Sequence, residues 1–491
     1  MPTANSGVAQ TDLGLPDTIT PNGLRLVRAE TVPAMQECFL RALAVYYIPS
    51  IVEKKGYDFA VFSPLRHTLR VMRALEKASG DSRLNFIEMA LIVQITSNDD
   101  DLKTIVASVL KFREQRNKSV NKKRFDREQR NTAAKTHGYA AHTFDDYADT
   151  NFRYLKATGL VQSNGRGLSL GAERKVFVNQ LLAMDAAPVS AHEYFAVLCN
   201  GAALPTDDAP TARLVLDDLL KQIKTRGIPF STKAFALDSA ADIAIVRHEI
   251  ESLLARQNEA HFANAQPGTW EEIAAYMELI IKRKSGKTLA NGFAIEIPRT
   301  EMPAYFEWVM WRAFLAINSL YNKPHEARRF KIDQDFLPVG TAPGGGADVV
   351  LEFSEFVLAV EATLTENSRQ EAAEGESVRR HIADLALTHK NKSVCGWFIA
   401  NKIDSNTAET VRIGVWYRKN DERMRLDIVQ FTLTQFKAFF EAMFKSKQNK
   451  VALLRTLLDS CGASRPQLDA LAWKTEIARV VDSHARQLSD E

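Results

Sequence analysis

Two acidic residues in the last third of the chain have a spacing that suits metal-dependent chemistry. Asp348 follows three glycines and opens a β-rich run, and Glu361 lies late in a second β-rich run, after the two-residue turn 354–355. If the two runs form a hairpin around that turn, Asp348 lies directly opposite Glu361. Two facing carboxylates repel each other unless a cation lies between them. Mg²⁺ prefers oxygen ligands, and there it would orient water to hydrolyse a phosphodiester.

The segment after the second run bears on this hypothesis. The alternative to a metal site is an exposed acidic hairpin, or a carboxylate bonded to the amides of the glycine loop. Residues 369–387 are good helix formers, and Gln370, Glu374 and His381 are spaced so that they share one face. That face would look back at the two acids, where polar side chains suit water activation and phosphate contact. A solvated face is the alternative for Glu374 and His381.

A third acid lies upstream. Glu307 is in the run 305–317, which is apolar on nearly every side and therefore predicts a buried helix. A buried carboxylate needs a partner, and the sequence leaves two open, Arg312 or the same metal ion. Further strands are predicted at 394–401, 411–417 and 426–431. The order helix, hairpin, helix, strand predicts an α/β sandwich with the acids at one edge.

The first third of the chain holds a local excess of positive charge. Between residues 111 and 135 the sequence has ten basic and three acidic residues, whereas the net charge of the whole chain is only +3. Such a run indicates either a nucleic-acid footprint or a solvated helix surface. The candidates for contact with DNA phosphates are Lys122, Lys123, Arg124 and Arg127.

The next segment has the layout of a winged helix. Residues 144–157 predict a helix with a buried stripe formed by Phe144, Tyr147, Ala148, Phe152 and Leu155. Residues 159–170 predict a hairpin with an Asn-Gly turn. In a winged helix the helix enters the major groove and the hairpin touches the backbone, although such units also occur as purely structural modules and in protein–protein contacts. The candidate DNA contacts are Asn151, Arg153, Lys156 and, at the hairpin tip, Arg166.

The composition is that of an ordinary globular protein, with 45% hydrophobic and 25% charged residues among 491. We expect a loosely held tail over 1–20 and a multidomain α+β chain. Its regions would be a helical, winged-helix-like region within 1–180, a helical linker over 181–290 and an α/β domain over 291–491. No run approaches the roughly 18 apolar residues of a membrane span, and no apolar signal segment opens the chain. These features predict a cytoplasmic protein without a membrane partner.

The four cysteines argue against two other classes of site. They are widely separated and form no Cys-x-x-Cys pair, so neither a zinc site nor a disulfide framework is expected. The residues concerned are Cys38, Cys199, Cys395 and Cys461.

The segments around the paired acids resemble a known family. They are Gly-Gly-Ala-Asp at 345–348, Val-Glu-Ala-Thr at 360–363, Ser-Arg-Gln-Glu-Ala-Ala-Glu-Gly-Glu at 368–376 and Val-Arg-Arg-His at 378–381. Together they are similar to the AlwI-like type IIS restriction endonucleases of the PD-(D/E)XK nuclease superfamily. The sharp resemblance covers residues 300–400, and the rest of the chain matches only in arrangement.

The resemblance implies an enzyme that binds a short asymmetric site in double-stranded DNA and cuts at a fixed distance outside it. DNA recognition would lie in 1–180 and the PD-(D/E)XK nuclease domain in 291–491. The implied cofactor is Mg²⁺, with Mn²⁺ as a substitute. The implied metal ligands are Asp348, Glu361 and the backbone carbonyl of Ala362.

The resemblance also implies roles for the other acids and shows one departure. Glu374 would complete the active site, Glu307 would match the upstream helix glutamate of the family, and His381 would be a further member. Thr363 stands where the superfamily usually has a lysine. The role of that lysine in positioning and activating water must then fall to another group, or be unneeded.

The sequence leaves the protein partners and two alternative functions open. One active site cuts one strand, so a second cut would need a transient homodimer or a second subunit, and a nicking enzyme is also open. A cognate DNA methyltransferase is implied as a functional partner. One alternative is a winged-helix DNA-binding protein with an inactive nuclease domain, which the missing lysine favours and the three converging acids oppose. The other is a structure-specific repair nuclease, which sequence-specific binding without dependence on flaps or ends would exclude.

Overall fold

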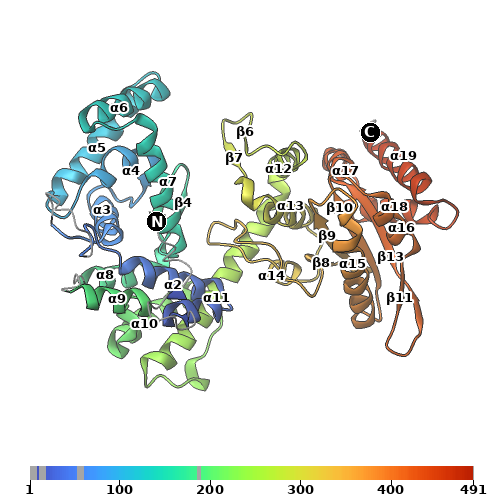
Figure 1. The fold of residues 1–491 in the computed structure, drawn as a ribbon, viewed down its shortest axis with the longest axis horizontal. Coiled ribbons are helices and arrows are strands. Elements are labelled where there is room, and N and C mark those ends of the chain that lie inside the picture. Colours follow the sequence, from blue (N-terminus) through green and yellow to red (C-terminus); the bar gives the residue numbers. More distant parts are fainter. Residues whose placement is uncertain (1–7, 10–17, 52–59, 185–189, 490–491) are drawn as a thin grey trace. The chain divides into compact units, whose positions relative to one another are not determined.

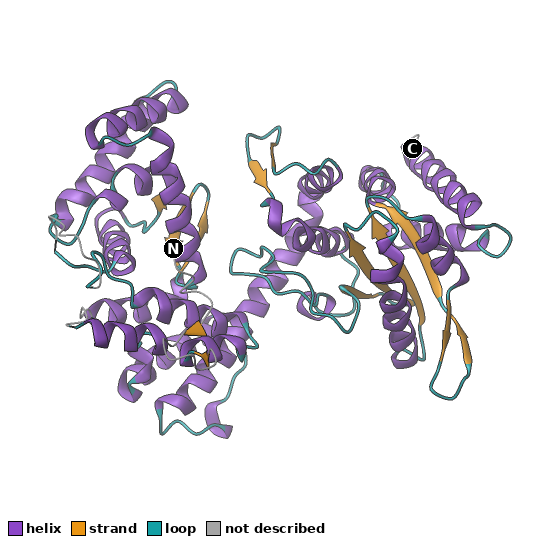
Figure 2. Cartoon of the chain, in the orientation of Figure 1, coloured by secondary structure: helices purple, strands orange, loops and turns teal. Residues whose placement is uncertain are grey.

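The computed structural model describes residues 8–9, 18–51, 60–184 and 190–489. They belong to two units, residues 1–255 and residues 256–491, and the division falls within the long helix α11 (Ala240–Ala265) (Figures 1 and 2). The expected linker region 181–290 contributes helices to both units, so the three-region division stays a prediction. The expected tail over 1–20 lies largely outside the described residues. In the part of the chain that is described, no helix could span a membrane.

The first unit is mainly helical. A continuous apolar cluster that runs from Leu40 to Leu254 forms its core. Short strands form a three-stranded sheet of order β3-β5-β4 with antiparallel pairs, made of β3 (Leu84–Asn85), β4 (Val161–Asn164) and β5 (Gly167–Leu170). The helices before α11 are α1 (Pro21–Val27), α2 (Val32–Ala44), α3 (Pro64–Ser79), α4 (Phe86–Leu91), α5 (Leu102–Lys118), α6 (Lys122–His137), α7 (Ala141–Ala157), α8 (Lys175–Ala183), α9 (Ala191–Asn200) and α10 (Ala209–Thr225).

Local capping explains where the basic helices begin. Ser97-Asn98-Asp99 in the sequence predicts a helix N-terminus, and this prediction is wrong. The helix α5 begins at Leu102, after Asp101, whose carboxylate accepts from the Thr104 backbone N–H at 2.9 Å. α6 follows Asn121, which caps it in the same way. The basic run over residues 111–135 therefore lies on two helices, α5 and α6, with a break after Lys118.

The helix and hairpin that resemble a wing differ from expectation in two details. Tyr147 of α7 is 63% exposed, because it lies about 80° from the centre of the stripe formed by the buried residues Phe144, Ala148 and Leu155. The hairpin turn comprises Gly165 and Arg166, one residue later than the predicted Asn-Gly turn, since Asn164 pairs with Gly167. Gly165 has φ +61°, a left-handed conformation that favours glycine.

The second unit is built around a four-stranded sheet of order β13-β10-β9-β8. β8 and β9 are antiparallel, whereas β9, β10 and β13 are parallel to one another. Val349 pairs with Val360 and Glu352 with Val357, which is the register predicted for the hairpin. The strands are β8 (Val349–Glu352), β9 (Phe356–Thr363), β10 (Ser393–Ala400) and β13 (Asp427–Thr432).

Helices cover both faces of this sheet. Trp397 of β10 packs against Phe314 of α13 and Phe436 of α17, while its neighbour Gly396 contacts Ile382 of α15. Adjacent strand residues point to opposite faces, so α15 lies across the sheet from α13 and α17. This is the predicted α/β sandwich. The helices are α12 (Trp270–Ile281), α13 (Met302–Ile317), α14 (Pro324–Ala327), α15 (Arg369–Thr388), α16 (Ser405–Ile413), α17 (Leu433–Lys445), α18 (Lys450–Ala463) and α19 (Ala470–Ser489).

Two short hairpins complete the unit, and one corrects a prediction. The strand predicted at 411–417 is helical up to Ile413, because Asp404 caps α16 and the helix ends only at Gly414, whose φ is +53°. The strand itself is shorter. The hairpins are β6 (Gly286–Thr288) with β7 (Ala294–Glu296), and β11 (Val415–Tyr417) with β12 (Arg423–Arg425).

Candidate active site

The two facing carboxylates of the hairpin form the centre of the site. Asp348 directly precedes β8, so the register that pairs Val349 with Val360 places it opposite Glu361 of β9. Opposed residues of an antiparallel pair share a face of the sheet. The Ala362 N–H donates to Asp348 Oδ2 at 2.9 Å. Glu361 is only 7% exposed, so the two acids face each other where little water can screen their charges.

α15 brings two further predicted residues to this centre. His381 Nδ1 lies 2.7 Å from Glu361 Oε1, and the Thr363 hydroxyl donates to Glu374 Oε1 at 2.9 Å. His381 Nε2 is buried and has no hydrogen-bond partner among the described residues. Gln370, predicted on the same face, instead donates to backbone carbonyls of the loops next to the helix. It therefore anchors loops, whereas Glu374 and His381 face the acids.

α13 supplies the upstream glutamate. Glu307 is 6% exposed, and its Oε2 accepts from the Ala342 N–H at 2.6 Å. Arg312, one of its two predicted partners, is engaged elsewhere, since it donates to Glu272 at 2.8 Å and to Gln266 at 2.6 Å. The buried Glu307 carboxylate thus faces the other acids without a guanidinium from its own helix.

Burial without sufficient positive charge shifts the protonation of these acids. Burial raises the pKa of Asp348 well above its usual range, and the charges of Glu361 and Glu307 raise it further. Burial also raises the pKa of Glu307 to about 7. The pKa of Glu361 is raised by burial as well, although His381 opposes the shift. These raised pKa values mean that the acids favour their protonated forms more than free carboxyl groups do, unless a cation joins the cluster.

One residue near the acids carries a charge that the sequence reasoning missed. Arg329 lies close enough to Glu361 to lower its pKa. Its backbone N–H donates to the carbonyl of Asp348 at 3.1 Å, which ties its segment to the start of β8. It belongs to no recognisable motif. The only signal for it in the sequence is indirect: Thr363 stands in place of a lysine, so a cation must come from elsewhere.

The donor set decides which cation would fit. Among the residues that the structure describes, no three His, Cys, Asp or Glu side chains form a metal-binding group. The pair Asp348 and Glu361 nevertheless offers carboxylate oxygens, and carboxylates with backbone carbonyls suit a hard cation such as Mg²⁺ better than Zn²⁺. The residues present are therefore compatible with Mg²⁺ bound by few protein ligands.

The predicted phosphate contacts on α6 lie in the first unit. Lys122, Lys123, Arg124 and Arg127 are all exposed, and no residue of the helix is fully buried. Arg124 forms an ion pair with Glu128 at 2.7 Å, which neutralises part of the positive charge. Both interpretations, a DNA-binding surface and a solvated helix, are compatible with this arrangement.

The predicted contacts on α7 and the hairpin differ in availability. Arg166 is exposed in the turn, and Arg153 is exposed but pairs with Asp149 at 3.0 Å. Asn151 is half-buried and donates to Gln94 Oε1 at 3.2 Å. Lys156 is half-buried as well. Asn151 is therefore engaged inside the fold, whereas Arg153 and Arg166 are both exposed.

Comparison with known proteins finds a family that matches the chain and a solved structure that is similar to part of it. The family model described as AlwI restriction endonuclease matches residues 8–439. Among solved structures, the chain is similar to the small subunit (R.BspD6I2) of the heterodimeric restriction endonuclease R.BspD6I. That match has 23% sequence identity and a TM-score of 0.32, and it covers 43% of this chain and 97% of that chain. No curated protein matches the sequence.

Proposed function

The chain belongs to the AlwI restriction endonuclease family and is a type II site-specific deoxyribonuclease, and from this premise we propose that it is a Mg²⁺-dependent enzyme of type IIS. It binds a short asymmetric site in double-stranded DNA through the first unit. The second unit hydrolyses phosphodiester bonds at a fixed distance outside that site.

The opposed carboxylates of Asp348, which is half-buried, and Glu361, which is buried, carry this proposal. A cluster with this excess of negative charge is costly in the folded protein unless a cation binds there. Perturbed acids that converge in this way are typical of catalytic sites. Asp348 and Glu361 would hold the ion, which would neutralise charge and make a bound water more acidic.

The backbone of β9 supports a third ligand. The N–H and C=O of one strand residue point toward the same edge. The Ala362 N–H bonds Asp348, so its carbonyl is also directed toward the side of the acids. We therefore assign the Ala362 carbonyl as the third protein ligand of Mg²⁺, and Mn²⁺ as the ion that would replace it.

The remaining residues hold and orient the ligands. His381 fixes the Glu361 carboxylate through Nδ1, and Thr363 fixes Glu374 through its hydroxyl. Thr363 cannot accept a proton as a lysine amine can, so it positions an acid and does not activate water. Glu307, with a pKa of about 7, holds or releases a proton near neutral pH.

The first unit supports a role in reading DNA. α7 is followed directly by the β4–β5 hairpin, and β3 extends that hairpin into a small sheet, which is compatible with a winged helix. In this interpretation Arg166 contacts the phosphate backbone at the hairpin tip. Exposed lysines of α6 add sequence-independent attraction to DNA.

A single active site cleaves one strand at a time. A double-strand cut therefore requires a second copy of the chain or another subunit, and without one the enzyme nicks. An enzyme of this kind also needs a cognate DNA methyltransferase, because host DNA must be protected from cleavage.

The test is cleavage of supercoiled plasmid by the full chain in Mg²⁺, followed by run-off sequencing of the product ends. Discrete ends at a constant offset from one short motif are expected, and the Glu361→Ala protein should bind the same DNA without cutting it. Ends scattered over the plasmid would contradict site specificity. Sequence-preferring binding without cleavage would favour a DNA-binding protein with an inactive nuclease domain.

A further inference from the structure

The guanidinium of Arg329 lies beside the acidic cluster without an ion pair among the described residues. It acts on Glu361 through its charge. One of its nitrogens, Nη2, donates to the carbonyl of Gly344 at 3.3 Å. The other, Nη1, is buried and has no hydrogen-bond partner in the part of the chain that is described. A buried donor without a partner lowers the stability of the folded protein, so such a group in a native structure is often there for a ligand.

Two other arginines of this unit with buried or half-buried guanidinium groups are used differently. Arg312 pairs with Glu272, and Arg328 forms two bonds to Glu259 at 2.7 and 2.8 Å. Each has a carboxylate partner that accounts for it structurally. Arg329, next to Arg328 in sequence, donates from one nitrogen to a backbone carbonyl, and its other nitrogen has no hydrogen bond among the described residues.

The glycine loop is shaped around this side chain. A Cβ placed on Gly346 would lie 2.2 Å from Arg329 Nη1 and 2.9 Å from Cζ, so any side chain there would displace the guanidinium. A Cβ on Gly344, in contrast, would meet nothing within 4 Å. Gly346 is therefore required for close packing of the loop on Arg329, and Asp348 stands two residues further along the same loop.

We propose that Arg329 is a catalytic residue that contacts the phosphate to be cleaved and supplies the positive charge that the lysine missing at position 363 would supply. This inference rests on the proposed nuclease function of the same site. Its nearness to Glu361 and the unsatisfied Nη1 place a phosphate-binding donor beside the expected metal ligands. Guanidinium groups bind phosphate oxygens with strong, charge-assisted hydrogen bonds.

Arg329 would supply the positive charge of the missing lysine but not its role in proton transfer. In hydrolysis the water oxygen forms a bond to phosphorus, and the bond from phosphorus to the leaving deoxyribose oxygen breaks. One water proton is released to solvent and the leaving oxygen takes one up, so a diester and water become a monoester and an alcohol. Negative charge on the phosphate grows in between, and Arg329 stabilises it. Arginine stays protonated, so it takes no part in the proton transfer.

Four variants test this assignment. Arg329→Gln should slow single-turnover cleavage at saturating Mg²⁺ about 100- to 1000-fold, the usual effect of losing one transition-state donor. DNA affinity in Ca²⁺ should change less than about 10-fold, because the charge acts mainly in the transition state. Arg329→Lys should recover at least about 10-fold of the lost rate. Gly346→Ala should be slowed like an Arg329 variant, whereas Gly340→Ala, where a Cβ would also meet nothing within 4 Å, should cleave at the rate of the unchanged protein.

The outcomes separate this inference from the proposed function. If the unchanged protein cleaves and Arg329→Gln cleaves within about threefold of it, Arg329 has no catalytic role. If Arg329→Lys cleaves no faster than Arg329→Gln, the proposal that Arg329 acts through its positive charge is wrong. It is wrong as well if the two glycine variants cleave at the same rate. Absence of cleavage by the unchanged protein refutes the nuclease function itself. Thermal unfolding of each variant in EDTA excludes loss of the fold as the cause of a low rate.

Discussion

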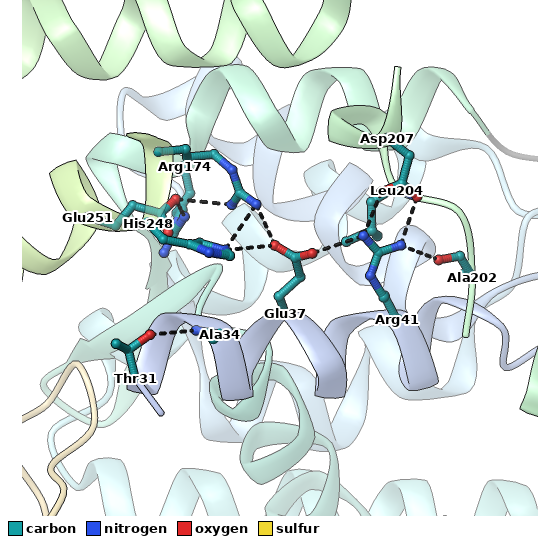
Figure 3. Close-up of polar contacts among 11 residues, drawn as sticks. Thr31, Ala34, Glu37, Arg41, Arg174, Ala202, Leu204, Asp207, His248 and Glu251 are labelled. Carbon is teal, nitrogen blue, oxygen red and sulfur yellow. Dashed lines mark hydrogen bonds and ion pairs between the residues drawn. The ribbon is translucent and has the colours of Figure 1, made fainter. Parts of the chain in front are cut away.

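The first and second units each bury a cluster of charged side chains, and the two clusters differ in balance. In the first unit, Glu37 of α2 bonds Arg247 and His248 of α11 and pairs with Arg41 at 2.9 Å (Figure 3). Arg41 also binds the carboxylate of Asp207. Every acid there contacts a guanidinium. In the second unit, several carboxylates face one another with one imidazole and one nearby guanidinium.

The protonation of the two clusters follows from this balance. Burial would raise the pKa of Glu37, but the hydrogen bond from His248 and the charge of Arg247 outweigh it and hold that pKa well below its usual range. The same competition lowers the pKa of Glu251, which bonds Arg174 and Arg247. Asp348 and Glu307 shift the opposite way because comparable partners are few.

The difference indicates which cluster is structural and which is functional. A buried acid with matched partners joins helices and needs nothing from outside the protein. Acids that repel one another lower the stability of the folded protein, and such strain is expected where a ligand relieves it. Removing charge from either cluster, and measuring activity and stability together, tests this assignment.

Asp348→Asn should produce the largest effect. Without one metal-binding carboxylate, single-turnover cleavage should fall at least about 1000-fold. In EDTA the same variant should be more stable by about 1–2 kcal/mol, because the like-charge repulsion is reduced. Cleavage assays and urea unfolding measure the two quantities. As a control, Glu355→Gln in the exposed turn of the same hairpin should leave the cleavage rate and the stability unchanged. A loss of stability in Asp348→Asn would show that the acids do not repel one another in the folded protein.

Arg247→Met should have the converse effect on the first unit. Removing this guanidinium leaves Glu37 and Glu251 buried with fewer partners, which typically costs about 3–5 kcal/mol. The matched control is Arg213→Met, which breaks an exposed pair with Asp217 and should cost less than about 1 kcal/mol. Equal losses of unfolding free energy in the two variants would mean that the buried network is not structural.

The acids of the two clusters should also affect the pH dependence of stability in opposite directions. Glu307 has a pKa raised to about 7, so between about pH 4.5 and 7 the unfolded chain loses its proton first and the metal-free protein becomes less stable as pH rises. The size is up to about 3 kcal/mol. For Glu37, whose pKa is lowered, stability is instead lost as pH falls below about 4.5. Urea unfolding in EDTA at pH 5 and pH 7.5 should show a smaller drop for Glu307→Gln than for the unchanged protein, and equal drops would contradict the shift at Glu307.

The elements of the second unit could be predicted from the sequence because short-range rules determine them. A two-residue turn sets the register of a hairpin, so the opposition of Asp348 and Glu361 followed from counting along the strands. Helical periodicity placed Glu374 and His381 on one face of α15. Helix starts and turns were less certain, as at Asp101 and Gly165, since neighbouring residues with similar capping or turn propensity compete.

Contacts between distant segments could not be predicted in this way. Arg312 and Glu307 are five residues apart, yet Arg312 pairs with α12 and Glu307 bonds the loop at Ala342. Arg329 reaches the acids only because its segment lies beside the start of β8, where Arg328 forms a bridge to Val349. No local pattern encodes that pairing. The role of the basic helices also cannot be settled by counting charges, because their pairing depends on the fold.

The smallest expected effect concerns these basic helices and separates binding from cleavage. Lys122→Gln together with Lys123→Gln should reduce the slope of log affinity against log salt by about two, one for each lost phosphate contact, and weaken binding. Arg124→Gln should change the slope less, because Glu128 already neutralises that guanidinium. Cleavage of saturated DNA should not change, since these residues lie in the first unit. An unchanged salt slope in the double variant would assign α6 to the solvated surface and leave Arg166 and α7 as the proposed DNA contacts.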